Sequence, residues 1–491
     1  MQKLKILFAA SEAVPFVKTG GLADVSGMLP QKLAELGHAV KVALPRYSAI
    51  PENLMNNAQD DITFDIDIDK ASHSLDLIRL VHNKHDLEYL FIGNDFFYDR
   101  PELYRDPKTG KDYIDNDDRF LFFCRGILEL LPRIKFHPDL IHANDWQTAL
   151  LPAFLKTAYE QDIKYAEIKS ILTIHNLAYQ GLFPDASFDK LGLEKDLFYA
   201  TRPFEFWGKL NFLKAGIIYA DVISTVSQTY AKEIQSSKEY GAGLEGVLKE
   251  RSDDLYGIIN GVDYNEWSPS KDKHLFRKYN QKNFSGKKIN KIELLKHANL
   301  PPRDNVPLIG MISRLADQKG FDLLSKAADE LLSLDIQMII LGTGEKKYHR
   351  LLQDLQTRFP DKLKAFITYD NTLAHRIEAG ADMFLMPSRY EPCGLNQLYS
   401  LKYGTVPIVR ATGGLADTIE QVDFDYGTGT GYLFEKYGAK AMMTSIKQAV
   451  RHFSKKRKWR QIMKNGMSKD NSWDASARKY VELYNVALSK K

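Results

Sequence analysis

The sequence has little cysteine and no long apolar run. Its 491 residues include two cysteines, Cys124 and Cys393, and neither stands in a Cys-x-x-Cys pair. This excludes a disulfide framework and fits a reducing cytosol, and a cysteine-based zinc site has no support. No apolar stretch approaches the ~18–20 residues of a membrane span. We therefore expect a cytoplasmic protein without a membrane partner.

The net charge is also small, at +4 for 491 residues. It gives no global reason to expect nucleic acid as a partner. The basic run at residues 455–458 could form a nucleic-acid patch, but the apolar residues around it favour a solvated helix face. Asp65, Asp67 and Asp69 could hold a metal, yet strict alternation with isoleucine is typical of a half-exposed strand. We expect neither nucleic acid nor metal.

The first 45 residues set the pattern of the fold. Residues 5–10 form a strand-length run that is apolar after Lys5. With Lys3 and Lys5 before the apolar part it resembles the start of a signal peptide, but polar Ser11 and Glu12 end it too soon. Apolar residues spaced by three and four between 22 and 36 predict an amphipathic helix that ends at Gly37. Residues 40–44 then form a second strand. A strand, helix and strand of these lengths predict a parallel sheet covered on both faces.

The same alternation continues along the chain and predicts two domains. Further strands are expected at residues 140–141, 170–174, 222–226, 257–259, 308–312, 338–341, 365–368, 383–386 and 406–409. A chain of 491 residues is too long for one core. We therefore expect an α/β protein of two doubly wound domains, residues 1–259 and 260–471, with residues 472–491 packing back onto the first.

Glycines and cations follow several of these strands, where ligands bind in open α/β sheets. Lys18 precedes Gly20 and Gly21 at the start of a helix, so the loop can hold an anion, although a tight turn would use the same glycines. Arg314 and Lys319 stand before another helix and suit a diphosphate; surface salt bridges are the alternative.

Three further side chains follow strands and could contact a sugar. Glu391, in a loop bracketed by proline and glycine, is the best carboxylate for a sugar or a developing oxocarbenium charge. Asp145 and His175 are its counterparts in the first domain, although a lone Asp or His after a strand is commonly structural. The loop at Gly342 has Lys347 where a dinucleotide fingerprint has its third glycine, so it supports NAD hardly at all.

Several motifs in register resemble those of bacterial glycogen synthase and plant starch synthase. They are KTGGLAD at residues 18–24, HNLAYQG at 175–181, NGVD at 260–263, SRL at 313–315 with QKG at 318–320, and PSRYEPCGL at 387–395. The resemblance runs in order over nearly the whole chain. It implies the GT-B fold, with two Rossmann-like domains that face each other across a deep cleft. It also implies elongation of α-1,4-glucan at the non-reducing end from ADP-glucose, with retention and without metal or cofactor.

The same resemblance assigns roles to individual residues. It places the donor phosphates at Lys18, Arg314 and Lys319. The sugar contacts are Asp145, His175, Asn260, Glu391, Cys393 and Gly394, and Tyr369 stacks on the nucleobase. Further donor contacts are expected at Gly20, Gly21, Asp24, Gly342, Leu395, Thr412, Gly413 and Gly414, and acceptor-side contacts at Glu12, Tyr98 and Asn176. A front-face mechanism is implied, in which the leaving phosphate accepts the proton and Glu391 orients the sugar.

The sequence departs from the family pattern in two segments. Asn144 and Gln147 stand where many bacterial members have histidine, so acceptor contacts can differ, and Thr368 and Asp370 replace Gly and His beside the base-stacking tyrosine. Tyr399, as in glycogen synthases, stands where a related group that uses UDP- and GDP-sugars carries a second glutamate, which disfavours that group.

The hexapeptide TGGLAD occurs twice, at residues 19–24 and 412–417. We expect the two loops to form two walls of one site, with Gly413 and Gly414 supplying amides. The alternatives are a GT-B transferase with another donor, such as UDP-glucose, or another acceptor; a phosphorylase, which needs a pyridoxal-phosphate lysine; and a non-catalytic carbohydrate-binding protein. No motif bears on oligomeric state.

Overall fold

The computed structural model describes residues 3–82 and 84–490. The chain divides into two compact units. Unit 1 runs to Val226, resumes over Ala231–Ile258 and ends with the segment from Trp473; unit 2 comprises Ser227–Tyr230 and Ile259–Ser472. The sequence placed the boundary after residue 259, and the structure has it after Ile258.

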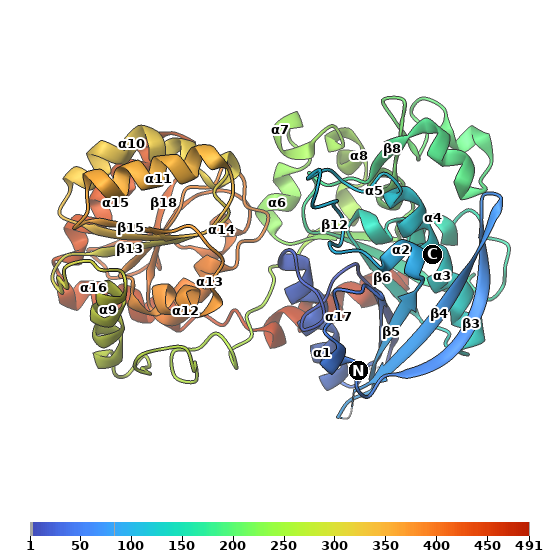
Figure 1. Ribbon diagram of the computed structural model, residues 1–491, viewed down its shortest axis with the longest axis horizontal. Coiled ribbons are helices and arrows are strands. Elements are labelled where there is room, and N and C mark those ends of the chain that lie inside the picture. The colour runs from blue at the N-terminus through green and yellow to red at the C-terminus, as the bar shows by residue number, and fades with distance from the viewer. Residues whose placement is uncertain (1–2, 83, 491) are drawn as a thin grey trace. The chain divides into compact units, whose positions relative to one another are not determined.

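Unit 1 is built on a nine-stranded sheet with helices around it (Figure 1). Its strands are β1 (Lys5–Ala9), β2 (Ala39–Pro45), β3 (Gln59–Ile68), β4 (Ala71–Val81), β5 (Leu87–Gly93), β6 (Leu140–Asn144), β7 (Lys169–Ile174), β11 (Val222–Thr225) and β12 (Leu255–Gly257). A separate three-stranded sheet contains β8 (Leu182–Pro184), β9 (Glu205–Phe206) and β10 (Lys209–Asn211). The sequence did not indicate this small sheet.

The helices of unit 1 lie between these strands in the chain. They are α1 (Gly21–Glu35), α2 (Asp95–Tyr98), α3 (Asn116–Arg133), α4 (Leu150–Leu155), α5 (Phe212–Tyr219), α7 (Lys238–Gly241), α8 (Glu245–Glu250) and α17 (Trp473–Ser489). Short 3-10 turns are η1 (Glu52–Leu54), η2 (Trp146–Thr148), η3 (Asp185–Leu191), η4 (Lys195–Phe198) and η5 (Ser252–Asp254). Helix α6 (Gln228–Glu233) has its first three residues in unit 2.

The strand order of the large sheet is β12-β11-β7-β6-β1-β2-β5-β4-β3. Strand β1 pairs in parallel with β2 and β6 and is buried after its first residue, as its continuous apolar sequence predicted. Helix α1 ends as predicted, because Gly37 takes a φ of 96° that favours glycine. The expected parallel βαβ start is therefore confirmed.

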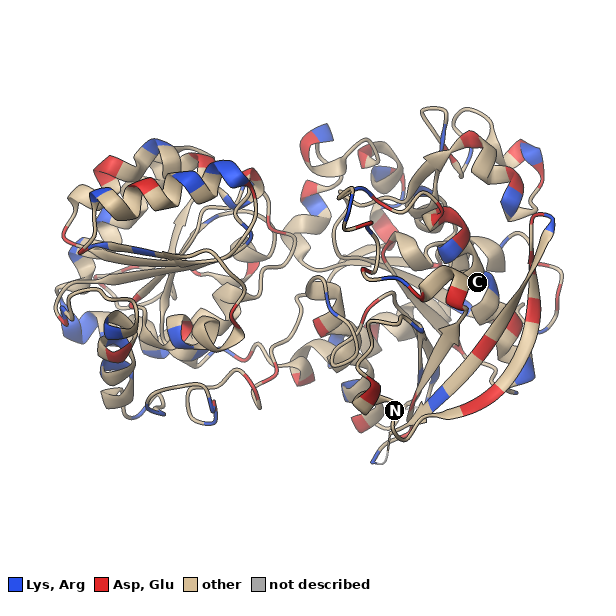
Figure 2. Ribbon diagram, viewed as in Figure 1, with Lys and Arg blue, Asp and Glu red and all other residues tan. Residues whose placement is uncertain are grey.

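The far edge of this sheet is antiparallel rather than parallel. Strand β4 pairs antiparallel with β5 and with β3. Along β3, Ile66 and Ile68 are buried whereas Asp65 and Asp67 are exposed, so the expected half-exposed strand is confirmed. Figure 2 shows the acidic segments along this strand. Repeated negative charge on an edge strand opposes pairing with another chain.

The strand expected at 140–141 is β6, which extends to Asn144, and two other predicted strands are displaced along the chain. The strand expected at 257–259 is β12, which ends at Gly257, and the strand expected at 365–368 is β15, which ends at Phe366. In both places the strand begins two residues earlier than the apolar pattern indicated, at Leu255 and Leu363. The register is set by parallel pairing with the neighbouring strands, which the local pattern does not contain.

The C-terminal helix α17 packs within unit 1, as the helical spacing of its aromatic residues indicated. Tyr480 and Tyr484 are fully buried. The Tyr484 hydroxyl lies 2.9 Å from Nδ1 of His142 in β6, and Nε2 of His142 lies 2.6 Å from Oγ1 of Thr173 in β7. This histidine thus links the helix to two strands.

We expect His142 to make the stability of unit 1 depend on pH. Burial lowers the pKa of His142 to about 3, so the unfolded chain takes up this proton at higher pH than the folded unit does. The free energy of unfolding should therefore fall as pH drops below ~6.5, by up to about 1.4 kcal/mol per pH unit from this group. Urea unfolding of the whole chain at pH 7 and pH 5 measures it.

The matched variants are His142→Gln, which cannot be protonated, and His137→Gln, which changes an exposed histidine of the same unit. Between pH 7 and pH 5, the free energy of unfolding of His142→Gln should fall by about 2 kcal/mol less than that of the wild type. The second should follow the wild type. Equal losses in all three proteins would show that His142 does not titrate on unfolding.

Unit 2 contains a six-stranded parallel sheet in the order β15-β14-β13-β16-β17-β18. The strands are β13 (Leu308–Ile312), β14 (Gln337–Leu341), β15 (Leu363–Phe366), β16 (Met383–Met386), β17 (Val406–Arg410) and β18 (Tyr432–Phe434). The helices are α9 (Ser285–His297), α10 (Phe321–Ser333), α11 (Lys346–Arg358), α12 (Asn371–Gly380), α13 (Asn396–Tyr403), α14 (Gly413–Thr418), α15 (Ala439–Phe453) and α16 (Lys456–Met467), with the turn η6 (Asp317–Lys319).

Helices cover both faces of this sheet (Figure 1). Helices α10 and α11 lie on one face and α9 and α12 on the other. Adjacent residues of β13 pack on opposite faces of the sheet. Ile309 belongs to the hydrophobic core that includes residues of α10, and Leu308 belongs to the core that includes residues of α9. The predicted doubly wound α/β fold is confirmed for this unit, and its ligand-binding edge is the edge where β13, β14, β16 and β17 end.

Candidate active site

The glycine loop of unit 1 joins β1 to α1 and is organised by a carboxylate. Glu12 is buried and accepts hydrogen bonds from the Thr19 backbone N–H, the Thr19 hydroxyl and the Gly20 N–H, the last at 3.2 Å. Burial raises the pKa of Glu12 despite these donors. The Cβ of any residue replacing Gly21 would meet open space, so the backbone there is accessible to a ligand.

The lysine that precedes this loop is held by the last residue of the hexapeptide. Lys18 Nζ lies 2.6 and 2.8 Å from the two carboxylate oxygens of Asp24. The Lys18 side chain is nevertheless 45% exposed. The structure therefore keeps Lys18 accessible to an anion and gives it an internal counter-charge.

Asp145 and His175 lie side by side at the ends of β6 and β7. An Asp145 carboxylate oxygen accepts the His175 backbone N–H at 2.7 Å, and Asp145 has a φ of 56°, in the left-handed region. Asn144 gives both amide hydrogens to carbonyls, so its oxygen accepts from His175 Nε2 at 2.9 Å. Burial raises the pKa of Asp145 to about 7 and lowers that of His175 to about 3, so the imidazole is neutral.

Asn176 completes this corner of unit 1. Its backbone N–H donates to the Asp145 carboxylate, and its side-chain oxygen accepts the Ala178 N–H at 3.1 Å. The residues predicted at the ends of β6 and β7 are thus brought together, as shared strand ends require.

In unit 2 the clearest charge pair joins residues 72 positions apart. Lys319 Nζ lies 2.8 and 2.7 Å from the two carboxylate oxygens of Glu391. The glutamate side chain is 8% exposed and the lysine side chain 18%. Gly320 allows this approach, because a Cβ there would lie 2.2 Å from the Pro387 carbonyl oxygen. The structure thus brings together the predicted phosphate lysine and the predicted sugar carboxylate.

The remaining predicted cation and aromatic of unit 2 are accessible. Arg314 follows β13, is exposed, and donates to the Gln318 side-chain oxygen at 3.0 Å. Tyr369 is 81% exposed in the loop between β15 and α12, where Asp370 caps the helix by accepting the Leu373 N–H. Both side chains can reach a ligand at the strand ends.

Other predicted glycines of unit 2 are explained by packing. A Cβ at Gly342 would lie 1.9 Å from the Ser313 carbonyl oxygen, and one at Gly413 would lie 2.0 Å from the Glu391 carbonyl oxygen. Gly394 has a φ of 69° beside the Gln397 amide. These glycines let neighbouring loops pass close to one another.

The second hexapeptide differs from its predicted role. The Gly414 N–H donates to the carbonyls of Glu391 and Pro392, both at 3.1 Å. The prediction that Gly414 offers its amide to the donor is therefore wrong in this structure, because the amide already holds the loop that carries Glu391. Thr412, the first residue of the second hexapeptide, is fully buried.

Asn260 and Cys393 lie next to each other in the interior of unit 2. The Asn260 N–H donates to the Cys393 thiol, whose pKa burial raises to about 12. The Asn260 side-chain oxygen is buried and, within residues 3–82 and 84–490, has no hydrogen-bond partner. A buried oxygen left unpaired is costly, so a ligand donor would stabilise it. Leu395, beyond Gly394, is half-buried.

Comparison with known proteins decides the family. The model described as starch synthase catalytic domain matches residues 5–250, and that described as glycosyl transferases group 1 matches residues 294–466. The glycogen synthase of Desulforudis audaxviator is 45% identical, over 99% of this chain and 97% of the relative. That of Thermotoga maritima is 42% identical over 99% of each. The chain belongs to the bacterial glycogen synthase and starch synthase family.

Two solved structures show the same fold. The catalytic domain of starch synthase IV from Arabidopsis thaliana, bound to ADP and acarbose, matches with a TM-score of 0.89 at 31% identity and covers all of both chains. Sucrose-phosphate synthase from Thermosynechococcus elongatus matches at a TM-score of 0.61 and 16% identity, which shows the fold alone. The GT-B fold and a glucosyltransferase acting on a glucan, as the sequence motifs implied, are confirmed.

One family-derived assignment fails on geometry. Tyr98, expected on the acceptor side, is fully buried in unit 1. Its hydroxyl donates to the Arg119 carbonyl at 2.9 Å, and its ring packs against Tyr47 and Phe122. Tyr98 is therefore wrong as a sugar contact in this structure, because its short helix α2 turns the ring into the core.

Three residues of the unit 2 site were not predicted. Ser388 donates to the Glu391 carboxylate at 2.9 Å, Gln318 donates to the Tyr390 carbonyl at 3.4 Å, and Arg410 donates to the Arg389 carbonyl. Ser388 and Gln318 stand inside the family motifs, but neither carries a charge that would have singled it out. Arg410 precedes the second hexapeptide in β17.

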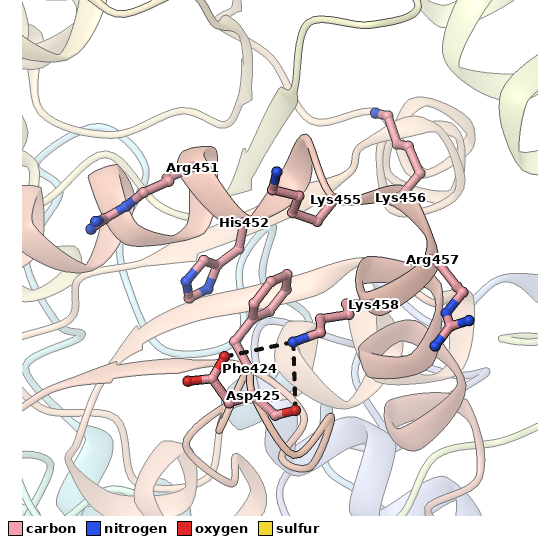
Figure 3. Close-up of a pocket in the computed structure, with 8 residues that line it drawn as sticks. All are labelled: Phe424, Asp425, Arg451, His452, Lys455, Lys456, Arg457 and Lys458. Carbon is pink, nitrogen blue, oxygen red and sulfur yellow. Dashed lines mark hydrogen bonds and ion pairs between the residues drawn. The ribbon is translucent and has the colours of Figure 1, made fainter.

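The basic run of α16 borders a separate cavity of about 590 Å³. Phe424, Asp425, Arg451, His452, Lys455, Lys456, Arg457 and Lys458 line it. Figure 3 shows Arg451, Lys455 and Arg457 pointing in different directions, while Lys458 turns toward Asp425. Trp459, Ile462 and Met463 of the same helix are buried, so the predicted solvated helix face is confirmed.

Residues 3–82 and 84–490 contain no group of three or more His, Cys, Asp or Glu side chains arranged to hold a metal ion. Over the same residues no helix is both long and apolar enough to cross a membrane.

Proposed function

We propose that this enzyme transfers glucose from ADP-glucose to the non-reducing end of an α-1,4-glucan, with retention at the anomeric carbon. The observation that carries the proposal is the Lys319–Glu391 pair, which joins the segment after β13 to the segment after β16, with Arg314 exposed just after β13. Cations at this edge suit the negative charge that develops on a diphosphate leaving group. The starch synthase IV structure, which was solved with ADP, supports the donor.

In this proposal each group has one task. Arg314 and Lys319 stabilise the departing diphosphate. Lys18 and the amides near Gly20 and Gly21 form an anion-binding loop of unit 1 that contacts the donor. The leaving phosphate accepts the proton of the incoming hydroxyl on the same face of the sugar. Glu391 orients the glucose and stabilises its positive charge.

Other predicted residues take part as contacts to the substrate. Tyr369 offers an exposed ring on which a nucleobase can stack. The unpaired Asn260 oxygen can accept a hydrogen bond from a sugar hydroxyl. Asp145 and His175 provide a carboxyl group and a neutral ring at the strand ends of unit 1. Cys393, Gly394 and Leu395 follow Glu391 in the same loop and are proposed as further contacts to the donor.

The test is glucose incorporation by the purified full-length chain. ADP-glucose and UDP-glucose are each supplied with glycogen, with fructose 6-phosphate or with no acceptor. We expect incorporation into glycogen from ADP-glucose, at least about tenfold faster than from UDP-glucose, a difference of about 1.4 kcal/mol in transition-state binding. Release of the new glucose by an enzyme specific for α-1,4 bonds identifies the linkage.

The outcomes separate the alternatives. Extension of glycogen from neither donor would overturn the proposal, and faster transfer from UDP-glucose would correct the donor. Binding of maltodextrin without binding of ADP would indicate a carbohydrate-binding protein. The proposal includes no metal ion, since side-chain cations supply the positive charge, so excess chelator should leave the rate unchanged. We also propose a cytoplasmic location, which the two free, buried cysteines support.

A further inference from the structure

The carboxylate of Glu391 is held by a serine as well as by Lys319. Ser388 Oγ donates to Oε2 of Glu391 at 2.9 Å, and Lys319 Nζ contacts both carboxylate oxygens. Ser388 is 1% exposed and Glu391 6% exposed. Because the hydroxyl is buried and lies only three residues before the glutamate, it stays close to the carboxylate whatever Lys319 does.

The two donors to Glu391, Lys319 and Ser388, have different roles when the substrate binds. In the proposed function Lys319 shares its hydrogen bonds between the Glu391 carboxylate and the diphosphate, because its ammonium has three N–H groups and contacts two carboxylate oxygens in this structure. Ser388 donates its hydroxyl hydrogen to the Glu391 carboxylate and has no contact to share with the leaving group. We infer that Ser388 is a positioning residue that keeps the Glu391 carboxylate oriented toward the sugar while Lys319 serves the leaving group; this inference rests on the proposed function.

The backbone around Glu391 is held by other groups. Arg410 donates to the carbonyls of residues 388 and 389, and Gln318 donates to that of residue 390. The Gly414 N–H donates to the carbonyls of residues 391 and 392, and the Gln397 amide to that of residue 393. Six successive carbonyls are thus fixed without the Ser388 hydroxyl. Removing that hydroxyl should change the orientation of one side chain and leave the loop in place.

The test compares Ser388→Ala with Ser388→Thr in glycogen extension by the full-length chain. A misaligned group and a lost hydrogen bond to a charged acceptor together predict that Ser388→Ala lowers kcat about ten- to hundredfold. The KM for ADP-glucose and the Kd for ADP, measured by calorimetry, should stay within about twofold, because no phosphate contact is removed. Ser388→Thr keeps the hydroxyl and should recover most of kcat.

Ser400→Ala is the matched control. Ser400 is also buried in unit 2 and donates to a buried glutamate, Glu378, at 2.7 Å, but lies outside the proposed site. Ser400→Ala should lose about as much thermal stability as Ser388→Ala but keep the wild-type kcat. Wild-type kcat in Ser388→Ala, equal losses in the two alanine variants, or a loss that lies in ADP binding would each overturn the inference. If the unaltered enzyme extends no glycogen, the proposed function fails instead.

Discussion

Replacing Lys319 by alanine should lower kcat for glucose transfer about 10²–10³-fold, the effect of removing one preorganised charge stabiliser. Lys319 is mostly buried and contacts both oxygens of Glu391, so its charge is already fixed at the strand ends before substrate binds. A fixed charge needs no reorganisation during the reaction. Initial rates with ADP-glucose and glycogen measure the change.

The stability of the Lys319→Ala variant needs its own control, because the change leaves the Glu391 carboxylate without its cation. Breaking a buried ion pair from one side is destabilising, less so here because the lysine is partly exposed. The double variant Lys319→Ala/Glu391→Gln removes the charge left behind and should regain melting temperature without regaining activity. Lys326→Ala, an exposed lysine of α10, should match the wild type in both. A wild-type rate in Lys319→Ala would remove this lysine from the site.

Replacing Glu391 by glutamine should abolish most turnover while keeping ADP binding. The glutamine has the same shape and can still accept the Ser388 hydrogen bond, but it lacks the negative charge that faces the sugar. We expect kcat to fall at least about 10²-fold. The Kd for ADP should be equal or lower, because Lys319 no longer has a carboxylate competing with the phosphates. Rate measurements and calorimetry on the same preparation give both values.

Glu378→Gln is the matched control for this change. Glu378 is fully buried in unit 2, and burial raises its pKa to about 8, so near pH 7 its carboxyl group is largely protonated. Glutamine closely resembles that neutral form. The variant should therefore keep the wild-type kcat. Loss of folding in Glu391→Gln, rather than loss of turnover, would make Glu391 a structural residue.

The fold could be predicted largely from local pattern. Continuous apolar runs identified β1 and β13 because strands buried on both faces of a parallel sheet are apolar throughout. Alternation identified the half-exposed β3. The bounds of β12 and β15 were wrong because strand pairing, rather than local composition, decides where a strand starts.

The site could be predicted in part. The rule that ligands bind at strand ends selected Asp145 and His175, and the structure brings them into contact. The same rule selected Lys319 and Glu391 but could not show that they pair. Ser388, an uncharged residue within a motif, gave no signal of its contact with the carboxylate. Tyr98 was assigned wrongly because a motif position does not reveal which way a ring points.

By itself, the sequence determined that this protein is a two-unit α/β enzyme with glycine loops and cations at its strand ends, because periodicity and turn chemistry are local properties. Only the tertiary structure decided that Lys319 pairs with Glu391, that Gly413 lies against the glutamate loop, and that the Gly414 amide holds this loop instead of being free for substrate. These contacts join segments that lie far apart in the chain. Their geometry depends on carbonyl positions and on the space left by a missing Cβ, which exist only once the strands have packed.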